Sequence, residues 1–508
     1  MGLLKKLAGE TVLYGASSIL GRFLNYLLVP LYTAVFSPGE YGIVTELYAY
    51  VAFLNILYVY GLETAYFRFS TKEGHDEKNV FNSCFTAILV TSVIFSLALS
   101  LFSTEIALLL EYPGKNHLII WLAAILAIDA VVAIPFARLR LQNRAQYFVL
   151  VKLISIFVNI ALNLFFLIYL PYRLNNFGPL PIFLEGIYNP SWGVEYIFIS
   201  NLVANGLILF MLLPTGSKLK LHFSLSTISP LLKYAYPFIF VGLAGVTNEM
   251  LSRAILKYRL PIDYYDNLSS IAALGIFGAC YKLAVFMTLA VQAFRYAAEP
   301  FFFAHAEQKN SPVIFARVMH WYIIFACFIF ISISINLDII GVVFLRNPEF
   351  REGLYIVPYL LMGGLFLGIY YNLSIWYKLT DKTLYGAVLS GIGAIVTIAF
   401  NIILIPYLGF LGSAITTLLT YSVMSLLSYT IGKKHLEIPY KVGKAIFYIF
   451  FAFIIVFSST YLEELYSAWI IRIGMIVAFL FTILILERET LYEKTFIETS
   501  DDQIHSED

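Results

Sequence analysis

Apolar stretches of about 20 residues recur along the whole of this 508-residue chain. Each stretch is long enough to cross about 30 Å of hydrocarbon as a helix. Only 13% of the residues are charged and 60% are hydrophobic, whereas a soluble protein of this length carries about 25% charged residues. The sequence therefore predicts an all-α polytopic membrane protein without a sizeable soluble domain.

The apolar pattern predicts 14 transmembrane helices joined by short connections. Their expected ranges are 11–36, 42–67, 81–103, 117–137, 147–170, 193–213, 234–256, 271–300, 313–337, 354–378, 384–406, 411–432, 445–462 and 468–487.

An internal repeat is visible in this pattern, because residues 39–69 resemble residues 272–303 in their opening Tyr/Phe–Gly pattern and their aromatic, charged end. Such repeats are common in transporters and place the substrate site between two halves. We therefore expect two pseudo-symmetric six-helix lobes plus two C-terminal helices. The expected segments are an N-lobe (1–213), a cytoplasmic linker (214–233), a C-lobe (234–432), two extra spans (445–487) and a polar cytoplasmic tail (488–508).

Lysine and arginine residues set the orientation of a membrane protein, since cytoplasmic segments are enriched in them. With the N-terminus inside, 21 of the 33 basic residues fall on the cytoplasmic side, 6 on the opposite side and 6 within spans. The sequence thus predicts a multi-pass membrane protein with both termini cytoplasmic.

Several charged and amide side chains lie inside the predicted spans, where an isolated charge costs about 2.5–3.5 kcal/mol or more. In the first half they form two polar faces, one with Ser18, Arg22 and Asn25, the other with Lys152, Ser155, Asn159 and Asn163, and Asp129 lies in a third span. In the second half they are Glu249, Arg253, Lys282, Arg295 and Glu299.

Some of these charges have a simple structural interpretation. Glu249–Arg253 and Arg295–Glu299 are spaced i, i+4, so each pair can neutralise itself, and Lys152 lies close enough to a helix end to reach the membrane surface.

Arg22 and Lys282 differ, because neither has an acidic residue within one turn of its own helix. Cations that face a wet cavity favour an anionic ligand, and arginine suits phosphate oxygens. The Asn, Ser and Tyr side chains nearby suit sugar hydroxyls.

Motifs for catalysis and metal binding are missing from the sequence. It contains no G-x-x-x-x-G-K-[ST] loop, no H-E-x-x-H motif and no paired Cys spacing for a metal. The net charge of +1 gives no indication of nucleic-acid binding. We expect a transporter rather than an enzyme, without a cofactor.

Three segments carry a resemblance to a known family: "YGASSILGRFLNYLLVPLYTAVFSPGEYGI" (14–43), "LGIFGACYKLAVFMTLAVQAFRYAAEP" (274–300) and "YKLTDKT" (377–383). They resemble the polysaccharide transporter and O-antigen-repeat flippase branch of the MOP superfamily, which also contains the lipid II flippase and the MATE drug antiporters. The resemblance runs from about residue 7 to 435.

This resemblance implies two six-helix lobes around a central cationic cavity that opens alternately to each side. It also implies translocation of a polyprenyl-diphosphate-linked oligosaccharide to the outer leaflet, with a polysaccharide polymerase and assembly proteins as partners besides membrane lipids. Carried onto this sequence, the cavity cations are Arg22, Arg253 and Lys282. The ion-coupling residue stays open among Asp129, Glu249 and Glu299.

The loop at 137–148 holds Arg138, Arg140 and Arg144. Either these arginines capture the anionic lipid at the cytoplasmic face, or they only follow the positive-inside rule. Three functions remain as alternatives to the flippase: a MATE-like antiporter for cationic drugs, a flippase of the lipid II type, and a membrane scaffold for glycan assembly. The drug antiporter requires a carboxylate-dominated cavity, whereas the deep charges without a partner on their own helix are basic here.

Overall fold

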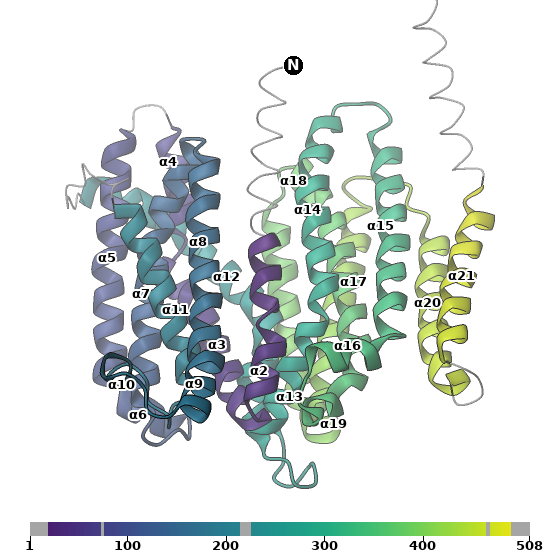
Figure 1. The fold of residues 1–508 in the computed structure, drawn as a ribbon. Coiled ribbons are helices and arrows are strands. Elements are labelled where there is room, and N and C mark those ends of the chain that lie inside the picture. The colour runs from purple at the N-terminus through teal and green to yellow at the C-terminus, as the bar shows by residue number, and fades with distance from the viewer. Residues whose placement is uncertain (1–18, 73–75, 214–224, 464–467, 489–508) are drawn as a thin grey trace, which may run out of the picture. The chain divides into compact units, whose positions relative to one another are not determined.

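The computed structural model describes residues 19–72, 76–213, 225–463 and 468–488, and every regular element in these ranges is helical (Figure 1). The first described helix is Ile19–Val35, of which α2 (Val29–Val35) is the second part. The predicted all-α membrane fold is confirmed. Ser18, the start of the first predicted span and parts of the predicted linker and tail lie outside the described residues.

The first half of the chain continues through a series of helices that includes one π-helical segment, η1. These elements are α3 (Pro38–Val59), α4 (Leu62–Ser70), α5 (Glu77–Leu101), α6 (Ser103–Leu109), α7 (Asn116–Leu141), α8 (Ala145–Leu164), η1 (Phe165–Tyr169), α9 (Leu170–Phe177), α10 (Ile182–Glu185) and α11 (Glu195–Leu212).

The second half contains the remaining helices and one 3-10 segment, η3. These are α12 (Leu225–Arg259), α13 (Ser270–Leu283), α14 (Val285–His305), α15 (Ser311–Ser334), α16 (Leu337–Phe344), η3 (Pro348–Ile356), α17 (Val357–Leu373), α18 (Ile375–Leu379), α19 (Leu384–Gly432), α20 (Val442–Glu463) and α21 (Ala468–Leu486).

Among the described residues, 11 helices are long and apolar enough to span a membrane. The number becomes 12 if α13 and α14, which meet at a 44° bend, count as one span. The predicted count of 14 is therefore not confirmed. One difference lies in how α19 is counted, because this single element contains both predicted spans, 384–406 and 411–432, with a non-helical break at Gly409 between them.

The long element α19 is interrupted at Gly409, whose φ of 56° and ψ of −137° are not helical. A straight helix of 49 residues would measure about 74 Å at 1.5 Å per residue, far more than a bilayer. Glycine can adopt this backbone conformation at low cost. The two arms contact each other on either side of the break, since Thr397 and Thr420 share a hydrogen bond of 2.9 Å, so α19 folds back on itself.

The helices form two compact units, residues 1–306 with 342–436 and residues 307–341 with 437–508. In the second unit, the carboxylate of Glu487 accepts hydrogen bonds from Lys444 (2.9 Å) and Tyr448 (3.0 Å) and lies 3.0 Å from His320. These contacts join α20 and the end of α21 to α15. The predicted domain boundaries stay a prediction.

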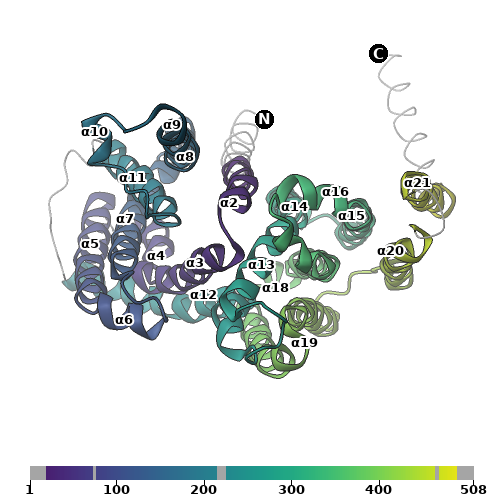
Figure 2. The ribbon, with the colours of Figure 1, turned by 60° about the horizontal axis from the view of Figure 1, so that its bottom comes forward.

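In the first unit, α3 packs against α13 and α12, and so joins the two halves of the chain (Figure 2). The approach of α3 to α13 depends on glycine. A Cβ atom at Gly42 would lie 2.1 Å from the Ile271 carbonyl oxygen, and one at Gly275 would lie 1.9 Å from the Pro38 carbonyl oxygen. Small residues allow membrane helices to pack at such short separations.

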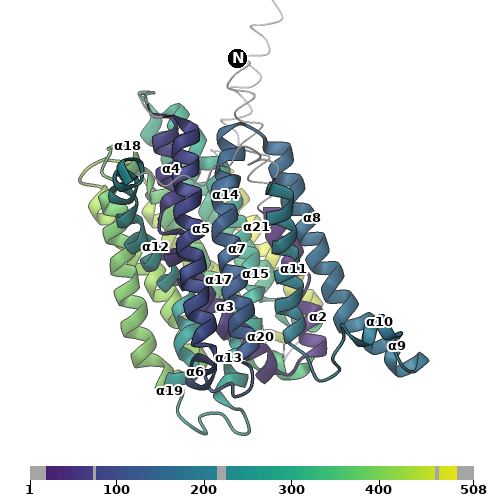
Figure 3. The ribbon, with the colours of Figure 1, turned by 90° about the vertical axis from the view of Figure 1, so that its left-hand side faces the viewer.

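Helix α8 continues through η1 into α9, and α10 follows nearby (Figure 3). The combined helix Ala145–Phe177 has 33 residues, or about 50 Å at 1.5 Å per residue. Its first part places the predicted polar face of Lys152, Ser155 and Asn159 within the first unit.

The Gly275→Ala variant is expected to destabilise the packing of α3 on α13. The added methyl group requires a helix shift, and overpacking of this kind costs about 1–3 kcal/mol. Thermal unfolding of the purified protein in detergent measures the effect. Gly206→Ala in α11 is the matched control, because a Cβ atom there meets nothing within 4 Å; equal unfolding temperatures for the two variants would contradict the prediction.

Candidate functional site

A cavity of about 660 Å³ lies in the first unit and is lined mainly by residues from the first half of the chain. Its size is typical of binding sites for small organic ligands, which measure about 300–1,000 Å³. The polar and charged residues of its wall are Arg22, Asn25, Tyr32, Tyr41, Tyr48, Asn55, Asp129, Lys152, Ser155, Asn159, Asn201, Asn205, Lys282 and Tyr296. Six residues predicted from the sequence as site residues are among them: Arg22, Asn25, Asp129, Lys152, Asn159 and Lys282.

Three cations line this cavity, and no ion pair joins any of them to another residue that the structure describes. The Lys282 ammonium lies 5.3 Å from the centre of the Tyr26 ring, and the Lys152 ammonium lies 5.2 Å from that of Phe148. Cation–π contacts of this kind are worth about 0.5–2 kcal/mol. They hold the two ammonium groups in place without an ion pair.

Asp129 supplies the carboxylate of the cavity wall. Its Oδ1 atom accepts a hydrogen bond of 2.8 Å from Asn205 on α11. One turn earlier on α11, Asn201 donates a hydrogen bond of 2.6 Å to the Tyr48 hydroxyl. The cavity therefore combines an excess of positive charge with several amide groups that can hydrogen-bond neutral polar groups.

A smaller cavity of about 120 Å³ is lined mainly by the second half of the chain, and Arg22 and Tyr296 belong to both cavity walls. Arg295 and Glu249 also line it. The Arg295 guanidinium lies 4.9 Å from the Tyr371 ring centre and 3.9 Å from the Glu299 carboxylate. Arg22 is thus placed where the two cavities meet.

The i, i+4 pairs expected from the sequence behave differently. Arg295 contacts Glu299, which also pairs with Lys378 of α18. By contrast, no ion pair joins Glu249 to Arg253 among the described residues. Arg253 is buried, and its guanidinium lies 3.9 Å from the centre of the Tyr281 ring, which lines the smaller cavity. Arg253 itself lines neither cavity, and its role in binding stays a prediction.

Two arginines of the predicted loop at 137–148, Arg138 and Arg140, lie instead in the last turn of α7, and both have acidic partners. Arg138 lies 3.1 Å from Glu77 and 4.3 Å from the Phe81 ring centre, and Arg140 pairs with Glu63. Arg144 is exposed, and no ion pair to it is found in the described part of the chain. These pairs give Arg138 and Arg140 a structural role, while lipid capture stays a prediction.

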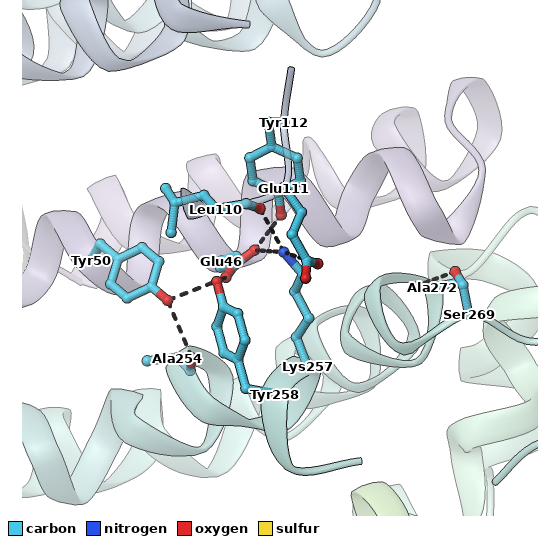
Figure 4. A network of polar contacts seen from close by, with 10 residues as sticks. All are labelled: Glu46, Tyr50, Leu110, Glu111, Tyr112, Ala254, Lys257, Tyr258, Ser269 and Ala272. Carbon is cyan, nitrogen blue, oxygen red and sulfur yellow. Dashed lines mark hydrogen bonds and ion pairs between the residues drawn. The ribbon is translucent and has the colours of Figure 1, made fainter. Parts of the chain in front are cut away.

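A buried polar network surrounds Glu46 at the opposite end of the helices from this loop (Figure 4). The side chain of Glu46 is fully buried, and it accepts hydrogen bonds from Tyr50 (3.2 Å), Tyr258 (2.8 Å) and Tyr112. The Lys257 ammonium lies 3.5 Å from the same carboxylate. Burial, together with the Glu46 carboxylate, raises the pKa of Tyr112 above its usual value. The Tyr112 hydroxyl therefore stays protonated and acts as a donor.

Sequence reasoning missed part of the cavity wall and this whole network. Asn201 and Asn205 are spaced i, i+4 in an apolar span, so a helical polar face was visible there. Neither Glu46 nor Lys257 is among the site residues predicted from the sequence. No sequence spacing connects these two residues, because 211 positions separate them.

The comparisons with known proteins agree with this geometry. Residues 34–171 match the family model described as "Polysaccharide biosynthesis protein". The chain has the fold of the MOP superfamily. The structure titled "Lipid II flippase MurJ, inward closed conformation" is similar with a TM-score of 0.70 and 15% identity, over 94% of this chain and 100% of that one. The resemblance seen in the sequence is thus confirmed.

Two MATE transporter structures extend the structural comparison. A multidrug resistance MATE family transporter in an inward-facing conformation has a TM-score of 0.61 and 12% identity, over 84% of this chain and 94% of that one. An outward-facing structure has a TM-score of 0.52 and 13% identity, over 84% and 95%. A search of curated proteins finds no significant match. Together these findings show a multi-pass membrane protein with the fold of these structures.

Arg138→Ala and Arg144→Ala are expected to have different effects on stability. Loss of Arg138 removes both an ion pair and a cation–π contact, so we expect a decrease of about 1 kcal/mol in the free energy of unfolding. Arg144→Ala is expected to stay within about 0.5 kcal/mol of the parent protein. Thermal or denaturant unfolding of the purified variants measures the difference, and equal stability would show that the Arg138 contacts contribute nothing.

Proposed function

We propose that this protein is a flippase that moves a polyprenyl-diphosphate-linked oligosaccharide from the cytoplasmic to the outer leaflet. It would act without catalysis, in an inner membrane with both termini cytoplasmic, and supply surface or capsular polysaccharide synthesis such as that of O-antigen. A polysaccharide polymerase and assembly proteins are its expected partners.

The observation that carries this proposal is the charge of the larger cavity. Its wall contains three cations, Arg22, Lys152 and Lys282, against the carboxylate of Asp129. Desolvating an isolated charge costs tens of kcal/mol in the Born limit. A diphosphate bound between these cations would replace its lost hydration with charged hydrogen bonds. The negative charge of the substrate in turn balances the excess positive charge of the cavity wall.

The neutral part of the substrate also fits the wall. Asn25, Asn159, Asn201 and Asn205 present amide groups that suit sugar hydroxyls. The cavity volume of about 660 Å³ fits a diphosphate with a short oligosaccharide rather than a finished polymer. The prenyl chain would stay in the lipid, where it needs no desolvation.

The membrane potential can drive this movement. Moving two negative charges outward across 100 mV, negative inside, releases about 4.6 kcal/mol, or about 2.3 kcal/mol per charge. The same field favours return of the empty cationic cavity. A coupling sodium ion or proton is the other expectation, with Asp129, Glu249 and Glu299 as candidates. Asp129 and Glu249 each line a cavity, whereas Glu299 pairs with Lys378.

The MATE-like alternative fits this cavity less well. A drug antiporter for cationic substrates requires a site dominated by carboxylates, and here the cations outnumber the carboxylate three to one. A lipid II-type flippase shares the cationic mechanism and differs only in the glycan. The identity of that glycan therefore rests on an experiment with lipid-linked precursors.

Arg22→Ala, Lys152→Ala and Lys282→Ala are each expected to weaken binding of a short-chain prenyl diphosphate by about 10–100-fold. This range follows from about 1.5–3 kcal/mol for a hydrogen bond to a charged group. Calorimetry on the purified protein measures the binding. Complementation of a strain without the gene then measures surface glycan, accumulated lipid-linked precursor and protein level.

Lys434→Ala, which removes an exposed lysine outside the cavity, is the control and should bind like the parent protein. Normal binding and normal surface glycan in all three cavity variants would refute the cationic flippase. The drive is tested in liposomes: flipping that ignores an imposed potential but requires a sodium or proton gradient would replace the potential-driven cycle with ion coupling.

A further inference from the structure

The network around Glu46 connects three separate segments of the first unit. Glu46 and Tyr50 belong to α3, Leu110–Tyr112 form the turn between α6 and α7, and Ala254, Lys257 and Tyr258 lie at the end of α12 (Figure 4). The first two segments come from the first half of the chain and the third from the second half. The network thus joins the two halves.

Every strong hydrogen-bonding group at the centre of the network has partners. Besides Glu46, the Lys257 ammonium contacts the Leu110 carbonyl oxygen at 2.6 Å and the Glu111 carboxylate at 3.2 Å. The side chains of Lys257 and Glu46 are 5% and 0% exposed. Removing one member of a buried ion pair is strongly unfavourable, because the other charge stays buried without compensation. This junction is therefore either fully formed or opened to water.

The polar network around Glu46 and the wall of the larger cavity lie on opposite faces of α3. Val44 and Tyr48 line the larger cavity, while Glu46 and Tyr50 contact α12. Residues four apart share a helical face, and residues two apart point in nearly opposite directions. Separating Glu46 from Lys257 would therefore move the helix that forms one wall of the cavity.

The glycine contacts lie beside the network and close the same junction. Gly42 of α3 lies one turn before Glu46 and is pressed against α13 of the second half, where a Cβ atom would meet the Ile271 carbonyl oxygen at 2.1 Å. Buried polar contacts and backbone packing thus occur at one end of the α3 junction. The charge count predicts that this end faces outward.

We propose that Glu46 and Lys257, with Tyr50, Tyr112 and Tyr258, form a lock that keeps the two halves together at the predicted outer face and closes the cavity on that side. Release of a cargo outward requires this ion pair to separate, and return to the closed state forms it again. Only the role of the lock in a transport cycle rests on the proposed function. Closure of the cavity at the outer face is a property of the protein without cargo and does not depend on that proposal.

The test measures access to the cavity from outside. Val44→Cys places a thiol on the cavity face of α3, and a membrane-impermeant maleimide is added to intact cells. The same protein without this cysteine is the blank, because Cys84, Cys280 and Cys327 are buried. Glu46→Gln and Lys257→Met are each expected to increase the labelling rate at least tenfold. The double variant should exceed neither single variant, since both break the same pair.

Lys115→Met is the matched control. Lys115 forms an ion pair of 2.8 Å with Glu195 at the same end of the helices, but both residues belong to the first half. Its labelling rate should equal that of the parent protein. Tyr258→Phe, which removes one hydrogen bond to Glu46 without a charge, is expected to give an intermediate rate. It also keeps the test valid if the charge variants do not fold, as judged by thermal unfolding.

Unchanged labelling in a folded Glu46→Gln, Lys257→Met or Tyr258→Phe protein would overturn the lock, as would an equal increase in Lys115→Met. This outcome would leave the proposed flippase untouched, because that proposal is tested by diphosphate binding. Conversely, normal diphosphate binding and normal surface glycan in all three cavity variants, together with the expected labelling changes, would refute the flippase and keep the lock.

Discussion

The cost of placing a charge inside a membrane determines how this chain distributes its polar residues. In lipid, an isolated charge needs an opposite charge, a water-filled space or a ligand. The structure uses two of these solutions in separate places. Glu46 and Lys257 compensate each other in a closed network, whereas Arg22, Lys152 and Lys282 line a cavity. The first arrangement stabilises one packing of the helices, and the second leaves attraction available for an anion.

The helical packing supports both arrangements. Gly42 and Gly275 allow α3 to lie close to α13, and α12 also packs against α3. Consequently, α3 contacts the second half over much of its length while its other face borders the cavity. Arg22, on the helix before α3, lines both cavities. The elements nearest the candidate site are therefore also the elements that join the two halves.

Much of this organisation follows from the sequence. The length and apolarity of the spans are enough to predict an all-helical membrane protein, and helical spacing places Lys152, Ser155 and Asn159 on one face. Arg22 and Lys282 are identifiable because no acid lies within a turn of them. The break in α19 was also predictable, because the non-helical Gly409 falls in the gap between the predicted spans 384–406 and 411–432.

Contacts between residues from distant segments are the main feature that the sequence did not predict. Glu46 and Lys257 look like ordinary residues near helix ends until the fold brings them together. The hydrogen bond between Asp129 and Asn205 likewise joins two helices that no sequence spacing connects. Conversely, Glu249 and Arg253 have the spacing of a pair, but no ion pair between them is found in the described structure. Side-chain direction and tertiary packing determine such contacts, and spacing along one helix does not determine either.

The two-sided character of α3 has an evolutionary consequence. Val44 and Tyr48 shape a compartment that must fit a particular cargo, while Glu46 and Tyr50 must match α12. Because these residues alternate along one helix, a change of tilt or rotation that adapts the first pair to a new cargo also displaces the second. Related proteins that carry different cargoes should therefore differ at the cavity face of α3 and, in a correlated way, at the end of α12. The residues at the end of α12 would change although they do not touch the cargo.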